Sequence, residues 1–78
     1  TNISFSLKND SRVELLIYNS IGQKVRTLVS SNYSKGIHSV EFDGENLSSG
    51  VYFYKLNAYS LLDGKKEFSQ IKKMLLTK

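Results

Sequence analysis

Apolar and polar residues alternate with a period of two along most of this chain. The stretches that show the alternation are residues 3–7, 13–18, 25–29, 37–42, 51–59 and 66–76. Because successive side chains of a β-strand point to opposite faces of the sheet, this period predicts half-buried strands. The last stretch is long enough to break into two strands. No window shows the period of an amphipathic helix.

Turn-forming residues separate these stretches. Groups rich in Asn, Asp, Ser and Gly stand at residues 9–11, 19–22, 30–36, 43–44, 48–50 and 63–64. Glycine supplies the positive φ that tight turns need, and the short polar side chains hydrogen-bond to nearby backbone. Short strands and turns in such succession are typical of an all-β fold. We therefore predict an Ig-like or fibronectin III-like antiparallel β-sandwich of about seven strands, a single domain over residues 1–78.

The alternation also predicts which side chains fill the core between the two sheets. One face of each strand in such a sandwich is buried and the other meets solvent. The residues that we expect to point inward are Ile3, Phe5, Leu7, Val13, Leu15, Ile17, Val25, Val40, Phe42, Tyr52, Tyr54, Leu56 and Phe68.

Composition narrows the kinds of site that the chain can carry. Its 78 residues include no Cys and a single His, which excludes disulfides and Cys nucleophiles and argues against a structural zinc site. No apolar run approaches the roughly 20 residues of a membrane-spanning helix, so we predict no direct membrane insertion. Since the sequence opens on Thr1, we expect it to be a fragment of a larger protein.

The positive charge is concentrated near the C-terminal end of the sequence. Residues 65–78 carry five lysines against Glu67 alone, whereas residues 1–64 carry equal numbers of basic and acidic residues. These lysines alternate with apolar residues and include no arginine, a pattern that favours a solvated face of a terminal strand. Docking on a negatively charged partner is the alternative. We predict no nucleic-acid partner, because no groove-reading helix accompanies the charge.

Residue types that carry catalysis are sparse and isolated. His38 lies in a predicted strand without a Ser or Cys partner, and Asp43 and Glu45 flank a glycine in a turn. No nucleotide-binding, metalloprotease or hydrolase motif is present. We therefore predict no enzyme, no cofactor and no resident metal. The sequence leaves open whether an ion binds at the turn of residues 43–45.

Aromatic residues offer a second kind of site. Carbohydrate-binding sandwiches stack sugar rings on exposed aromatic side chains, and Tyr33 and Tyr59 are the candidates for such stacking because they lie near strand ends or loops. Tyr52 and Tyr54 share the predicted core face. An adhesive or carbohydrate-binding module appended to a secreted hydrolase is therefore an alternative function.

Three stretches together resemble a known family. Residues 17–25 read Ile-Tyr-Asn-Ser-Ile-Gly-Gln-Lys-Val, residues 47–52 read Leu-Ser-Ser-Gly-Val-Tyr, and residues 72–76 read Lys-Lys-Met-Leu-Leu. In this order and spacing the chain resembles the type A C-terminal sorting domain of the type IX secretion system of Bacteroidetes and related bacteria. It is also similar to the Ig-like domain of the flagellar hook-capping protein, which makes an assembly module a further alternative.

The resemblance implies a non-catalytic sorting function. It implies that the domain follows an N-terminal cargo domain in the same chain, that an outer-membrane translocon recognises it, and that a surface sorting protease then removes it. The implied location is the periplasm in transit, then the outer membrane, the cell surface or the medium. The residues that match the family's motifs and that we expect to serve recognition are Gly50, Tyr52, Lys72, Lys73 and Lys78.

Four of these residues also have a structural interpretation that does not depend on the family. Gly50 is expected to adopt a backbone conformation that a Cβ disfavours, and Tyr52 to place its ring in the core and its hydroxyl on a backbone partner. Lys72 and Lys73 charge the last strand, which protects an edge strand from unwanted pairing. Alternatively, this last strand pairs with a strand of a receptor through main-chain hydrogen bonds along its edge.

Overall fold

A computed structural model describes residues 2–44 and 47–77 of the chain, and every regular element among them is a β-strand. No helix able to cross a membrane occurs in these two ranges. The strands are β1 (Asn2–Leu7), β2 (Ser11–Asn19), β3 (Lys24–Tyr33), β4 (Gly36–Glu41), β5 (Gly50–Ser60) and β6 (Lys66–Leu76).

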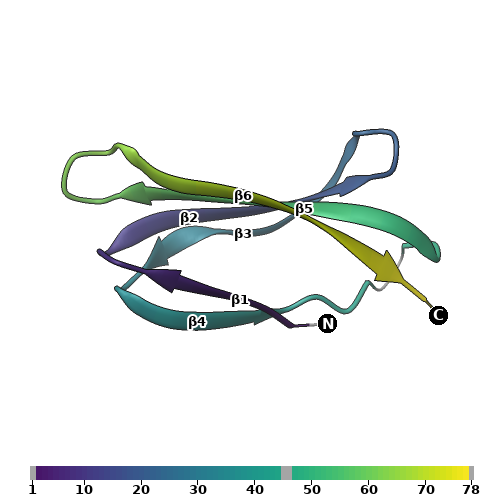
Figure 1. Ribbon diagram of the computed structural model, residues 1–78, viewed down its shortest axis with the longest axis horizontal. Coiled ribbons are helices and arrows are strands. Elements are labelled where there is room, and N and C mark those ends of the chain that lie inside the picture. The colour runs from purple at the N-terminus through teal and green to yellow at the C-terminus, as the bar shows by residue number, and fades with distance from the viewer. Residues whose placement is uncertain (1, 45–46, 78) are drawn as a thin grey trace.

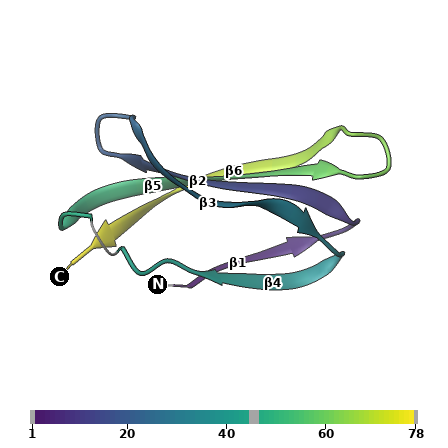
Figure 2. The ribbon, with the colours of Figure 1, turned by 180° about the vertical axis from the view of Figure 1, so that it is seen from behind.

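Two antiparallel sheets form the layers of the molecule. The larger sheet has the order β3-β2-β5-β6, and the smaller one consists of β1 and β4 alone. Figure 1 shows the small sheet lying beneath the large one, and Figure 2 shows the same two layers from behind. The body is elongated, with extents of 39 × 21 × 17 Å. The predicted all-β antiparallel sandwich is confirmed.

The strand count differs from the sequence prediction, which was about seven. The described residues form six strands because residues 66–76 remain one strand and do not break into two. The reason is its partner: β5 and β6 are both 11 residues long and pair from Gly50↔Leu76 to Tyr59↔Lys66, with one irregularity near the hairpin. A continuous ladder keeps the whole of β6 in the sheet.

The core lies between the two sheets. Its buried apolar residues are Ile3, Phe5, Leu7, Val13, Leu15, Ile17, Val29, Phe42, Tyr52, Leu56 and Ala58. Most of the predicted inward set is therefore buried, and Val40, Tyr54 and Phe68 are half-buried and pack against it. The alternation of β1 and β2 predicted their buried residues because each strand keeps one phase throughout. On β5 it predicted Tyr52 and Leu56 but not Ala58.

The prediction of Val25 as a core residue is wrong. Val25 is 38% exposed, and Val29 takes the buried place on β3. The pairing of β2 with β3 shifts register between Leu15 and Leu16 and again between Ile17 and Tyr18. Each irregularity inserts an extra residue in β3 and inverts which side chains face the core. Simple alternation along residues 25–29 therefore fails at this strand.

Candidate recognition surface

The three motif stretches meet at one end of the large sheet. Asn19, at the end of β2, pairs with Tyr52 on β5, and Tyr52 pairs with Met74 on β6. These residues belong to the first, second and third stretch respectively, although they are more than 20 positions apart in the sequence. Figure 1 shows this end of the molecule at the right, where the β2–β3 hairpin, the start of β5 and the end of β6 lie. We refer to it as the motif end.

A hydrogen-bonded turn forms one part of the motif end. The Asn19 side-chain oxygen accepts hydrogen bonds from the backbone N–H groups of Ile21 (3.1 Å) and Gln23 (2.9 Å). The backbone N–H of Asn19 donates to the carbonyl of Gln23 at 2.9 Å. These bonds fix the hairpin in one shape and leave the Ile21 side chain exposed at its tip.

Tyr52 connects the motif end to the core. Its ring is buried, and its hydroxyl donates a 2.8 Å hydrogen bond to the carbonyl of Ser48. This is the arrangement expected from the sequence. Gly50 has φ of +155°, so it lies outside the range that residues with a side chain adopt readily, although no atom within 4 Å would meet an added Cβ.

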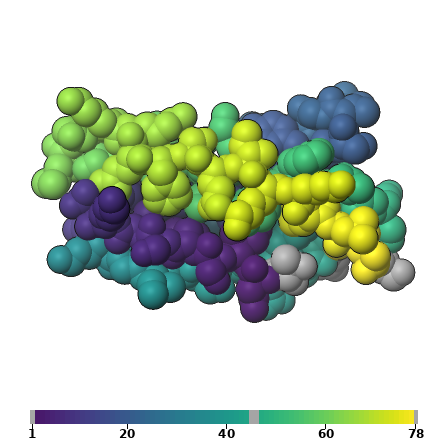
Figure 3. Space-filling model, in the orientation of Figure 1, coloured from purple at the N-terminus to yellow at the C-terminus, as the bar shows by residue number. Residues whose placement is uncertain are grey.

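The two adjacent lysines of β6 point to opposite sides of the sheet. Lys72 pairs with Tyr54, whose side chain lies on the core-facing side, and Lys73 pairs with Phe53, which faces outward. Both lysines are exposed because β6 is the last strand of its sheet, and Figure 3 shows it running across the front surface. Lys78, the fifth recognition residue expected from the sequence, lies outside the described residues.

The outward face at the motif end contains a hollow of about 350 Å³. Its lining residues are Tyr18, Gly22, Phe53, Lys55 and Ile71. They come from β2, the hairpin, β5 and β6, so the hollow lies where the first motif stretch approaches the two C-terminal strands. Sequence analysis missed these residues, although a signal existed: residues 15–18 and 51–54 are apolar or aromatic in both phases of the alternation.

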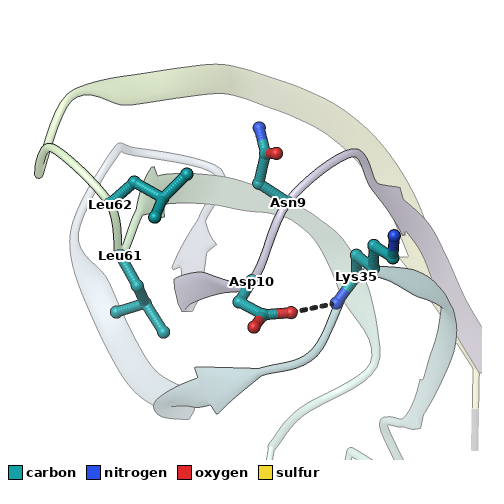
Figure 4. Close-up of a pocket in the computed structure, with 5 residues that line it drawn as sticks. All are labelled: Asn9, Asp10, Lys35, Leu61 and Leu62. Atoms are coloured by element: carbon teal, nitrogen blue, oxygen red, sulfur yellow. Dashed lines mark hydrogen bonds between the residues drawn. The ribbon is translucent and has the colours of Figure 1, made fainter.

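The opposite end of the sheet carries a hollow of another character, about 300 Å³ in volume. Figure 4 shows its lining residues, Asn9, Asp10, Lys35, Leu61 and Leu62. The Asp10 carboxylate accepts a 2.9 Å hydrogen bond from the backbone N–H of Lys35, and the Asp10 carbonyl accepts one from Leu61. Asp10 thus ties together the loops of this end, a structural role for its carboxylate.

The aromatic candidates for sugar stacking take part in packing. Tyr33 is half-buried, with its ring centroid 5.5 Å from that of Phe5 and 4.9 Å from that of His38. The ammonium of Lys66 lies 5.8 Å from the ring centroid of Tyr59. The two tyrosines lie on β3 and β5, and no observation in the described residues favours the carbohydrate or the assembly alternative.

The isolated polar residues considered for catalysis or ion binding also have structural partners. His38 Nε2 lies 2.6 Å from the carbonyl of Ser34, and Arg26 lies 3.9 Å from the carboxylate of Asp43. Glu45 is outside the described residues. Within residues 2–44 and 47–77 no group of three or more potential metal ligands comes together.

Comparison with known proteins identifies the family. No curated protein and no solved structure matches the chain. The family model described as the secretion system C-terminal sorting domain matches residues 1–74, which is nearly the whole sequence and includes most of each motif stretch. The chain therefore belongs to the family of C-terminal sorting domains of the type IX secretion system.

Proposed function

We propose that the outer-membrane translocon of the type IX system recognises this domain as a folded surface and exports the cargo protein attached to it. The observation that carries the proposal is the convergence of the three motif stretches at one end of the large sheet, through the pairs Asn19↔Tyr52 and Tyr52↔Met74. A sorting domain needs a surface that its receptor can identify, and three distant segments aligned across one sheet form such a surface only in the folded state.

The cargo would be an N-terminal domain of the same chain. After passage from the periplasm through the outer membrane, a surface sorting protease would remove the sorting domain, and the cargo would remain at the cell surface or enter the medium. The domain contributes shape, charge and exposed side chains to this process and supplies no reacting group. The structural partners of Asp10 and His38 support this division of roles.

Export of a reporter protein tests the proposal. Residues 1–78 are fused to the C-terminus of a periplasmic reporter in a host that has this secretion system. We expect the fused reporter at the cell surface or in the medium, while a reporter without the domain stays in the periplasm. Equal retention of both reporters, with the fused domain shown to be folded, would overturn the proposal.

Deletion of residues 72–78 is a second test, but a loss of export in this variant has two causes that must be separated. The deletion removes the charged end of β6, and we expect it to abolish export. However, it also removes Met74 and Leu76, which pack against the core, so loss of export would also follow from unfolding. Point substitutions on the exposed face of β6 separate the two causes.

A further inference from the structure

Apolar side chains cover the outward face of the large sheet at the motif end. An antiparallel sheet with one face on the core is ordinarily polar on the other. Here the apolar outward positions, which follow from the register with the buried residues of β2 and β5, are Leu16, Tyr18, Val51, Phe53, Ile71 and Leu75. Ile71 is 64% exposed and Leu75 is 68% exposed. We call these six residues the outer patch.

The outer patch is concave at its centre. The hollow of about 350 Å³ between Tyr18, Gly22, Phe53, Lys55 and Ile71 is bounded on one side by the β2–β3 hairpin. Figure 1 shows this hairpin rising from the sheet on the side away from β1 and β4. A hollow with an aromatic floor and a raised wall fits a single protruding side chain of a partner.

Three lysines lie among the residues of the outer patch. Lys24 pairs with Tyr18, Lys55 with Ile71, and Lys73 with Phe53, so all three side chains stand on the outward face. Among the described residues, the one ion pair within 4.0 Å is Arg26–Asp43, and none of these lysines takes part in one. The acidic residue of β2 on this face, Glu14, lies opposite Asn57, further toward the other end. Glu14 is the diagonal neighbour of Lys55, whereas Lys73 has no acidic residue opposite or diagonal to it. A cation without a nearby carboxylate favours a partner that brings one.

We infer that the outer patch docks an acidic segment of a partner protein, with one apolar side chain of that segment in the hollow and carboxylates beside Lys55 and Lys73. The inference rests on the proposed function in one respect: it takes the partner to be a component of the export machinery. It goes further because it states which face of the domain the partner binds and the chemistry of the segment that binds there.

A protein partner fits the shape better than an anionic lipid surface does. A flat bilayer surface meets the protruding side chains first, whereas the hollow between Tyr18, Phe53 and Ile71 has the size of a single side chain of a partner. The lysines also lie among the apolar residues of the patch and do not form a separate rim, which suits carboxylates held at fixed positions. Flotation with anionic vesicles, described below, tests binding to a lipid surface directly.

The adjacent lysines of β6 provide a matched pair of substitutions. Lys73→Glu reverses a charge among the residues of the outer patch, and Lys72→Glu makes the same change one residue away on the opposite face of the same strand. In the reporter assay we expect Lys73→Glu to lower export at least about tenfold, since a reversed charge at a docked lysine opposes the partner's carboxylate. Of the two lysines that the family motif contains, the inference assigns recognition to Lys73 alone, so Lys72→Glu, on the core-facing side of β6, should export like the unmodified domain.

The outcomes separate this inference from the proposed function. If the unmodified domain fails to direct export, the proposed function fails and the inference falls with it. If the unmodified domain exports and both lysine variants export equally well, the proposed function stands and the outer patch is not the recognition face. Equal loss in both variants would also overturn the inference, because it would show no preference between the faces.

A second pair of variants tests the apolar contact. Ile71→Ser removes an exposed apolar side chain from the outer patch, and Ile37→Ser removes one that is 83% exposed on β4 of the other sheet. We expect the first to lower export and the second to leave it unchanged. Denaturation midpoints of all four variants establish that each is folded. Unchanged export with a folded Ile71→Ser variant would contradict the docking of an apolar side chain.

Direct binding tests the chemistry of the partner. The chain is titrated with a peptide of alternating Glu and Leu and, separately, with one of alternating Lys and Leu, and backbone amide shifts are followed by NMR. We expect shifts on β5 and β6 around Phe53 and Ile71 with the acidic peptide alone. No shift with the acidic peptide at millimolar concentration, or equal shifts with both, would overturn the assignment of an acidic segment. Flotation of the chain with phosphatidylglycerol vesicles, lost in Lys73→Glu, would assign the patch to lipid instead.

Discussion

The two ends of the large sheet carry hollows of similar size, but the polar groups beside the hollows differ in whether they form hydrogen bonds within the domain. At the end shown in Figure 4, the Asp10 carboxylate bonds to the Lys35 backbone, and the Asn9 amide donates to Glu67. At the motif end, Lys55 and Lys73 stand beside an apolar hollow without a carboxylate partner in the described part of the chain. At one end the carboxylates of Asp10 and Glu67 accept hydrogen bonds within the domain, whereas at the other two ammonium groups are left available to a receptor.

This difference separates stability from recognition. Groups that are paired within the domain contribute to folding, and their removal should alter the free energy of unfolding. Groups that are exposed and unpaired contribute little to folding, so that their removal should alter export while the domain stays folded. Tyr52 is buried beneath the motif end, and Gly44, in the segment after β4, is buried against Leu76 at the end of β6. Substitutions at these two positions are expected to give the largest stability effects.

Tyr52→Ala should have the largest effect on stability. The ring is 8% exposed, and its hydroxyl bonds to the carbonyl of Ser48, so truncation leaves a cavity and an unpaired carbonyl. We expect a loss of about 3–5 kcal/mol in the free energy of unfolding, measured by chemical denaturation. Tyr52→Phe is the control and should cost about 1 kcal/mol, because it removes the hydrogen bond alone. A loss for the alanine variant no greater than that for the phenylalanine variant would show that the ring is not a core element.

Gly44→Ala should have the next largest effect. Gly44 has φ of +65°, and an added Cβ would lie 2.5 Å from Leu76 Cδ1, so both the backbone and the contact disfavour a side chain. We expect a loss of about 1–3 kcal/mol in the unfolding free energy.

Gly50→Ala is the matched control for Gly44→Ala. Its backbone is also disfavoured for alanine, but nothing within 4 Å would meet the Cβ, and we expect it to cost less than Gly44→Ala. Leu76→Ala removes packing of its own, but the loss in the Gly44→Ala/Leu76→Ala double variant should be smaller than the sum of the two single losses, because the contact is then absent. A Gly44→Ala variant as stable as the parent would contradict the close approach of this turn to the end of β6.

Asp10→Ala should have a smaller effect, confined to the opposite end. The substitution removes the hydrogen bond between its carboxylate and the Lys35 backbone, which is exposed, so we expect about 0.5–1 kcal/mol of destabilisation. Export of the fused reporter should not change. Loss of export in a folded Asp10→Ala variant would remove the contrast between the two ends.

Lys73→Glu should have the smallest effect on stability. Its exposed side chain has no ion-pair partner among the described residues, so we expect the unfolding free energy to change by no more than about 0.5 kcal/mol. The same measurement on Lys72→Glu should give a similar value. Marked destabilisation by Lys73→Glu alone would mean that its effect on export reports folding and not docking.

The sequence by itself determined the fold class, most of the core and the family. Alternation in β1 fixed which of its side chains are buried, because a strand with one apolar face can be placed in a sandwich in only one way. The phase of β2 and β5 was also indicated, although both strands carry apolar residues on their outward face as well. The sequence also indicated the role of Tyr52, since an aromatic ring with a hydroxyl needs both a core and a backbone acceptor. The family followed from local motifs that can be read without coordinates.

Tertiary structure decided what alternation cannot encode. The irregular pairing of β3 with β2 inverted the expected face of Val25, and the unbroken pairing of β6 with β5 reduced the strand count to six. It also decided that Lys73 and not Lys72 faces outward, and it gathered Tyr18, Phe53 and Ile71 around one hollow. The physical reason is that strand register sets which distant residues become neighbours, and register depends on the partner strand as much as on the strand itself.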